Sequence, residues 1–138
     1  MVTSSASSFA LAAFEFKKSC DVCTKIYDKP CAHYASDALA RAGWDILEPH
    51  DAITPGGRCE GPKGKKRPIR SHDIKAWVEA HGWEGKVAKP PKGIAAFFFC
   101  MRDSDSQGHC GFIDILGAVR DSGTGENFGE KKNRLYYY

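Results

Sequence analysis

The fold is decided by the stretch KPCAHYASDALARAG (residues 29–43), which predicts one helix with a cysteine in its first turn. Pro30 suits the first helical position, and Gly43 can end the helix in a left-handed conformation. An apolar face recurs at helical spacing through Cys31, Ala35, Ala38, Leu39 and Ala42. The Cys31 thiol therefore lies where a packed helix meets solvent, beside backbone N–H groups whose partial positive charge favours a thiolate.

Length and composition predict one domain over residues 1–138, with 42% hydrophobic residues and a net charge of only +3. No apolar run is long enough to span a bilayer. Residues 1–8 are Ser-rich and expected to fray, and residues 1–16 lack the features of a secretion signal. We therefore expect a chain that is made in the cytoplasm and leaves the cell, if at all, by another route.

The remaining periodicity predicts helices first and strands afterwards. Ser8 can cap a short helix that buries Phe9, Ala12, Ala13 and Phe16, and Ser71 can cap another, ending near His81, that buries Ile74, Trp77 and Val78. Strands are expected at 94–101 and 109–116, with 117–121 pairing back and 134–138 closing the sheet. The result is an α+β domain with N-terminal helices packed on a small antiparallel sheet.

Residues 45–70 interrupt this pattern as an irregular basic insertion. Its charge comes from Arg58, Lys63, Lys65, Lys66, Arg67 and Arg70, opposed only by Glu60. A solvated loop is the simplest interpretation, and attraction of anionic substrate groups is the alternative.

A nucleophilic cysteine needs a base, and His109 is the best of the five histidines. It begins a strand directly after Gly108, whose missing side chain lets another element approach closely. Of the other four, His33 lies on a different side of the Cys31 helix and His50 lies in irregular chain. His72 and His81 lie in the first turn and at the end of the helix that follows Ser71. An acid must then orient His109: Asp121 is favoured if residues 116–117 turn the chain back, and Asp114 is held in reserve because a bulge would reverse the strand parity.

Three motifs in this order carry a resemblance to a known family. PCAHYASDALARAG (30–43) resembles the nucleophile helix of CHAP- and NlpC-type cysteine peptidases of bacterial cell walls. PKGIAAFF (91–98) is similar to their strand after a Pro-Gly turn, and GHCGFI (108–113) to their Gly-His strand. The resemblance implies a papain-like fold with Cys31 as nucleophile, His109 as base and no cofactor or metal.

The small size, the absence of a signal peptide and the Ala-rich cysteine helix are most similar to type VI secretion amidase effectors, the second effector family above all. Such proteins are antibacterial toxins that cut peptidoglycan peptides in a competitor's periplasm. The resemblance therefore implies a peptidoglycan substrate, export through secretion machinery and a cognate immunity protein at the Cys31 cleft. The Cys31 backbone N–H and one upstream donor would hold the oxyanion, and Tyr27 is a candidate for that donor or for substrate positioning.

Two other functions remain open at this point. Cys20, Cys23, His33 and Cys59 could hold zinc in a binding module whose 63–67 loop contacts nucleic-acid phosphates, although the ligand spacing is irregular and nucleic acid is not the expected partner. The same cysteine and histidine would also serve an amidase or deamidase that acts on host proteins. Of the six cysteines, those other than Cys31 are expected to be buried thiols with one disulfide among them.

Overall fold

The computed structural model describes residues 6–18, 31–59, 67–85, 93–101, 108–121 and 135–138. Within these ranges the chain forms three helices followed by four strands, which confirms the predicted α+β class. No helix in the described ranges is long and apolar enough to cross a membrane.

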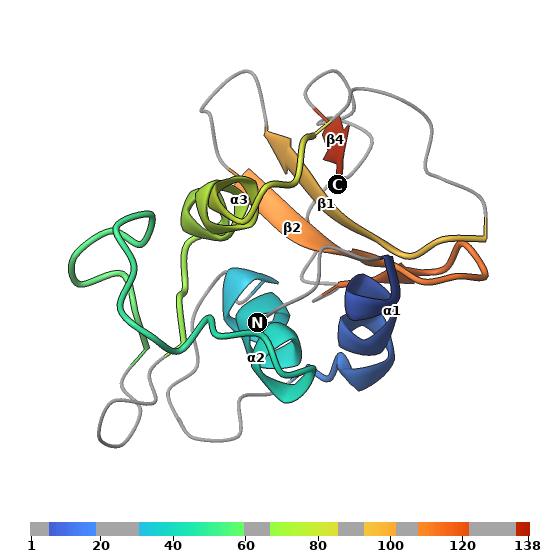
Figure 1. Ribbon diagram of the computed structural model, residues 1–138, viewed down its shortest axis with the longest axis horizontal. Helices are drawn as coiled ribbons and strands as arrows, with labels where there is room; N and C mark the ends of the chain where they lie inside the picture. The colour runs from blue at the N-terminus through green and yellow to red at the C-terminus, as the bar shows by residue number, and fades with distance from the viewer. Residues whose placement is uncertain (1–5, 19–30, 60–66, 86–92, 102–107, 122–134) are drawn as a thin grey trace.

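The helices are α1 (Ala6–Glu15), α2 (Cys31–Arg41) and α3 (Ser71–Ala80). Figure 1 shows α1 and α2 side by side below the sheet, with α3 next to β2. The faces predicted to be buried are buried, since Phe9, Ala12 and Ala13 of α1 and Ile74, Trp77 and Val78 of α3 all lie in one hydrophobic core. Gly43 follows α2 with a φ of 93°, the left-handed conformation expected of a helix stop.

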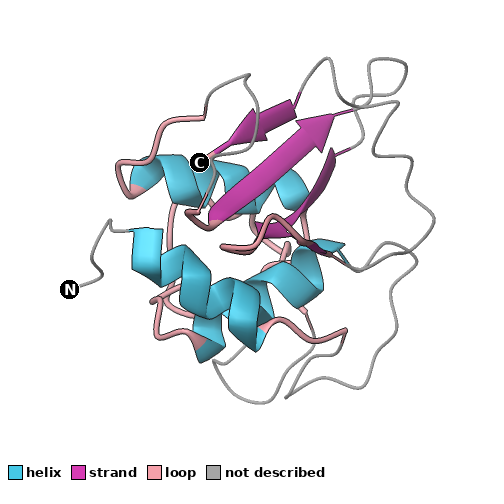
Figure 2. Cartoon of the chain, turned by 90° about the vertical axis from the view of Figure 1, so that its right-hand side faces the viewer, coloured by secondary structure: helices cyan, strands magenta, loops and turns pink. Residues whose placement is uncertain are grey.

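The sheet is antiparallel with the strand order β3-β2-β1-β4. Its strands are β1 (Ala96–Met101), β2 (Gly108–Ile113), β3 (Val119–Arg120) and β4 (Leu135–Tyr137). The central pair β1–β2 places Cys100 opposite His109 and Phe98 opposite Gly111. The C-terminal strand β4 pairs with β1 and forms the edge of the sheet, as expected (Figure 2).

Both faces of β1 are buried because its side chains alternate between two clusters. Phe97 and Phe99 belong to the core between the sheet and the helices. Phe98 and Cys100 pack with Ile113 on the opposite side of the sheet. A strand that is apolar at every position needs cover on both sides, as the uninterrupted run of apolar residues predicted.

Two element boundaries differ from the expectation. β2 ends at Ile113, because residues 114–118 form a turn in which the Asp114 N–H donates to Ala118 O and Gly117 has a φ of 85°. Ser71 does not cap α3: the cap is Arg70, in extended conformation, and Ser71 is the first helical residue. Both corrections change the neighbourhood of the candidate site.

The basic insertion is irregular, as predicted, but parts of it are packed into the molecule. Ile46, Ile53 and Cys59 are buried, and Arg58 and Pro68 form an isolated bridge. Residues 60–66 lie outside the described ranges.

Candidate active site

Cys31 occupies the first position of α2 and is almost completely buried, with 3% of its surface exposed. Its Sγ lies 3.1 Å from the Ser71 Oγ at the start of α3. α2 also packs on β2, and the contact with Ser71 joins the first residue of α2 to the first residue of α3. The N-terminal ends of both helices therefore lie beside this sulfur, where their partial positive charge favours a thiolate.

His109 and Asp121 form the sheet side of the site. The His109 Nε2 lies 2.9 Å from the Asp121 Oδ2, and the imidazole is 1% exposed. Pairing of Phe112 with Arg120 sets the register of the β2–β3 hairpin, which brings Asp121 opposite Gly111 and onto the His109 side of the strand. The chain thus turns back at Leu116–Gly117, which is the condition under which Asp121 was favoured as the acid that orients His109.

Gly111 is needed for this approach. A Cβ at Gly111 would lie 2.9 Å from the Asp121 Cβ and 2.6 Å from the Arg120 carbonyl oxygen. Any side chain here would push Asp121 away from His109, so the glycine is a spacer for the pair. The sequence motif contains this glycine, but nothing in the sequence alone told us which residue it makes room for.

Asp114, the reserve candidate, has a different task. Its Oδ1 accepts hydrogen bonds from the backbone N–H groups of Leu116 and Ala118, each at 2.9 Å. It therefore stabilises the turn between β2 and β3, and of the two carboxylates it is Asp121 that contacts His109. Tyr27, proposed as an oxyanion donor, lies outside the described residues.

The surroundings of Cys31 lower the pKa of its thiol from the ordinary value to about 4. The largest cause is a hydrogen bond from Cys110, followed in the same direction by hydrogen bonds with His109 and Ser71 and by the positive charge of His109, while burial opposes the shift. A buried sulfur whose pKa is lowered in this way has the surroundings of an activated thiolate.

Cys110 is the donor that the sequence did not reveal. Burial raises its pKa well above the ordinary value, and the nearby Cys31 raises it further. Cys110 therefore stays a thiol and can donate its S–H to the Cys31 thiolate. Strand parity puts Cys110 on the helix-facing side of β2, so a signal was present in the alternation of GHCGFI, although it gave no hint of a partner.

The other four histidines lie elsewhere. His33 is buried within α2, where burial lowers its pKa, and its ring stacks on Tyr34. His81 contacts the Trp77 carbonyl oxygen and the Asp45 carboxylate. The remaining two, His50 and His72, are exposed, as expected.

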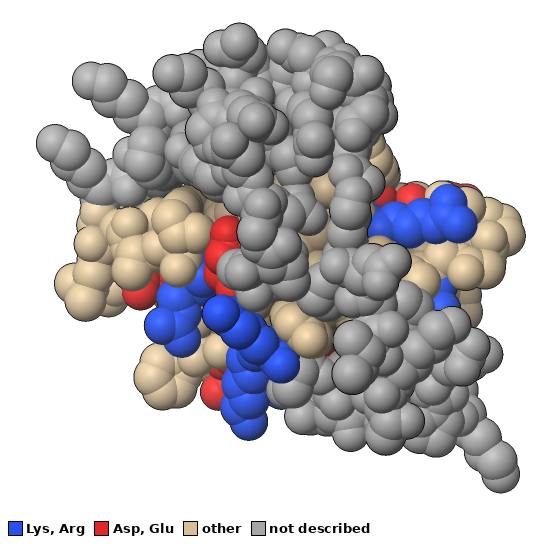
Figure 3. Space-filling model, turned by 180° about the vertical axis from the view of Figure 1, so that it is seen from behind, with Lys and Arg blue, Asp and Glu red and all other residues tan. Residues whose placement is uncertain are grey.

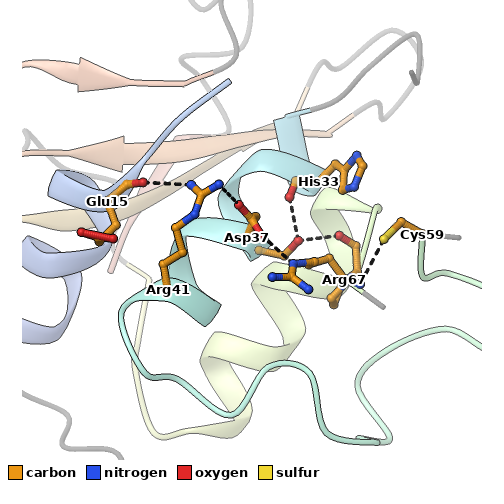
Figure 4. A network of polar contacts seen from close by, with 8 residues as sticks. Glu15, His33, Asp37, Arg41, Cys59 and Arg67 are labelled. Carbon is orange, nitrogen blue, oxygen red and sulfur yellow. Dashed lines mark hydrogen bonds and ion pairs between the residues drawn. The ribbon is translucent and has the colours of Figure 1, made fainter. Parts of the chain in front are cut away.

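In the basic insertion, the expectation of a solvated or substrate-attracting loop is wrong for Arg58 and Arg67, and Lys63, Lys65 and Lys66 lie outside the described residues. Arg67 is 6% exposed and its Nε lies 2.6 Å from the Asp37 Oδ1 of α2. Arg41 pairs with the other oxygen of Asp37 and donates to the Glu15 carbonyl oxygen, so one network joins α1, α2 and this segment (Figure 4). Arg58 donates to backbone carbonyl oxygens of residues 46 and 48. Arg58 and Arg67 therefore contribute to stability, and among the described cations of the insertion Arg70 is the exposed one.

A hollow of about 320 Å³ opens beside Asp121 and carries positive charge. It is lined by Phe16, Lys17, Lys18, Val119, Arg120 and Asp121. Figure 3 shows Lys and Arg side chains gathered in groups on the back of the molecule, with acidic side chains against them. A hollow with three cations next to the pair His109–Asp121 suits an anionic group.

The zinc ligands considered above are only partly described. Cys20 and Cys23 lie outside the described residues, and the Cys59 Sγ accepts a hydrogen bond from the Arg67 N–H. Within the part of the chain that the structure covers, no three His, Cys, Asp or Glu side chains are grouped as metal ligands. No disulfide joins any of the four described cysteines, Cys31, Cys59, Cys100 and Cys110.

Comparison of the chain with protein-family models, with curated proteins and with solved structures finds no match.

Proposed function

We propose that the protein is a cysteine amidase with a papain-like arrangement, which cleaves peptide bonds of peptidoglycan. The observation that carries the proposal is the hydrogen-bonded pair His109–Asp121, together with surroundings that lower the pKa of the Cys31 thiol to about 4, His109 among their causes. Nucleophile, base and orienting acid are the three parts that acyl transfer requires.

In this mechanism the Cys31 thiolate attacks the carbonyl carbon of the scissile amide. The protonated His109 then gives its proton to the leaving amine, and the acyl group stays on sulfur. A water molecule that loses a proton to His109 next attacks the thioester, which releases the carboxylic acid and restores the Cys31 thiolate beside the protonated His109. Asp121, bonded to Nε2, leaves Nδ1 as the nitrogen that exchanges protons with the sulfur side.

The first oxyanion donor is the backbone N–H of Cys31, at a helix start where a developing negative charge is favoured. Tyr27 remains the candidate for positioning the substrate. No metal or cofactor takes part in this proposed reaction.

Peptidoglycan is proposed as the substrate on two grounds. The Cys31 helix and the Gly-His strand resemble those of cell-wall cysteine peptidases, and stem peptides carry free carboxylates that suit the cations of Lys17, Lys18 and Arg120. The same resemblance leads us to propose a type VI secretion effector that acts in the periplasm of a competitor. An immunity protein in the producing cell would then cover the Cys31 cleft.

The test is digestion of purified peptidoglycan by the wild-type protein and by Cys31→Ala and His109→Ala. We expect the wild-type protein to release fragments whose masses identify the cut bond, γ-D-glutamyl–diaminopimelate or the diaminopimelate–D-alanine cross-link, and both variants to release none. Cys59→Ala and His81→Ala are matched controls, because each changes the same residue type away from the site. Full activity in Cys31→Ala or His109→Ala would refute the proposal, and salt-dependent nucleic-acid binding with bound zinc would favour the binding module instead.

A further inference from the structure

Ser71 has a position that its own helix does not explain. A serine at the start of a helix usually caps it, but α3 is capped by Arg70, and the Ser71 Oγ lies 3.1 Å from the Cys31 Sγ, 40 residues earlier in the chain. Ser71 is 7% exposed, so its hydroxyl has little access to solvent. Its hydrogen-bonding capacity is thus directed at a sulfur.

The backbone around Ser71 is arranged to allow this contact. A Cβ at Gly108 would lie 3.2 Å from the Ser71 Cβ and 2.9 Å from the Phe99 Cε1. The glycine at the beginning of β2 therefore lets the first turn of α3 pack closely on the sheet. The glycine predicted to admit a helix beside His109 admits α3.

We propose that Ser71 is a positioning residue for the Cys31 nucleophile, donating its hydroxyl proton to the thiolate and holding the sulfur against β2. The inference deepens the proposed function, since it rests on Cys31 as the attacking group. A hydroxyl bonds an anionic sulfur more strongly than a neutral thiol, so the contact favours the ionised form. The titratable groups that face Cys31 are His109 and Cys110, with Asp121 behind His109.

Ser71 also acts on Cys110, the neighbouring thiol of β2, whose pKa it lowers against the larger effect of burial. Because Cys110 keeps its proton, its S–H can donate to Ser71 or to Cys31, while the single proton of Ser71 goes to the thiolate. The Ser71 hydroxyl thus contacts the sulfur of α2 and lies close to the Cys110 thiol of β2.

The experiment measures the rate of iodoacetamide alkylation of Cys31 against pH, with mass spectrometry of peptides to separate Cys31 from the other cysteines. Ser71→Ala should raise the midpoint of the profile by about one pH unit, which is roughly a tenfold loss of thiolate below that midpoint. Ser71→Thr keeps the hydroxyl and should restore the wild-type midpoint, and Ser71→Val, of the same size without the hydroxyl, should not. The Thr–Val pair isolates the hydroxyl even if both variants are less stable than the wild type.

Ser36→Ala is the matched control, because Ser36 is a fully buried serine of α2 whose hydroxyl bonds the carbonyl oxygens of His33 and Pro68. It should leave the midpoint unchanged. Equal midpoints for Ser71→Thr and Ser71→Val would overturn the inference. Alkylation needs no peptidoglycan, so a wild-type protein that leaves peptidoglycan intact would refute the proposed function alone.

Discussion

The two sides of the candidate site are built differently. Cys31 belongs to a helix that a buried ion network and the main core hold in place, whereas Asp121 follows a strand of two residues, and its side chain is 22% exposed. The sulfur is thus fixed by burial, and the carboxylate is fixed by one hairpin turn and one glycine. We conclude that changes to the ion network that holds α2 should cost stability, and changes to the hairpin that holds Asp121 should cost activity.

The largest effect is expected from Asp37→Ala on the helix side. It leaves Arg67 and Arg41 buried without their shared carboxylate, which should lower the free energy of unfolding by about 3–5 kcal/mol. Chemical denaturation measures the loss. Lys75→Ala, which breaks the more exposed Lys75–Glu79 pair, should cost less than about 1 kcal/mol, and equal losses for the two variants would contradict the contrast.

On the hairpin side, Asp121→Ala should reduce kcat/KM for peptidoglycan peptides about 100-fold or more, because His109 loses the group that orients it. Its free energy of unfolding should stay close to that of the wild type. Asp114→Ala removes two turn hydrogen bonds and should cost less activity than Asp121→Ala. The reverse order of the two variants would assign the orienting role to Asp114.

A third effect concerns stability and pH. The folded Cys31 thiol has a pKa of about 4, well below the pKa of the same thiol in the unfolded chain. Ionisation of Cys31 therefore stabilises the folded state. This stabilisation is complete above the unfolded pKa and is lost as the pH falls through about 4. The stability advantage of the wild type over Cys31→Ala should therefore grow as the pH rises from 5 to 8. Denaturant midpoints of both proteins across this range measure it, and a constant difference would speak against an ionised thiol.

The smallest effect is expected at the hollow beside Asp121. Replacing Lys17 and Lys18 together by Ala should raise KM for carboxylate-bearing peptides severalfold and leave kcat nearly unchanged, since only attraction of the substrate is weakened. The difference from the wild type should shrink at high salt. An unchanged KM would remove this hollow from the substrate path.

Much of this arrangement follows from local patterns in the sequence. Spacing predicted the buried faces of α1, α2 and α3 and the strand with two buried faces, and parity with a turn at Gly117 brought Asp121 to His109. These features depend on a few neighbouring residues, which is why they can be recognised without coordinates.

The remaining features depend on how distant elements pack. Serine is a residue type that often caps helices, so the sequence predicts a cap at Ser71. Its hydroxyl contacts Cys31 only because α3 packs closely on the sheet at Gly108. Arg67 lies in a Lys- and Gly-rich stretch, which predicts exposure to solvent. Arg67 is buried because it pairs with Asp37 on another element. Both roles come from three-dimensional contacts between residues at least 30 positions apart.

The central claim is that His109 acts on the Cys31 sulfur, and the most direct test is the pH dependence of Cys31 alkylation in the wild-type protein and in His109→Ala. Action of His109 on the sulfur predicts a wild-type midpoint near 4 and a clearly higher midpoint once the imidazole is removed. A wild-type midpoint close to that of an ordinary thiol, unchanged by His109→Ala, would contradict it.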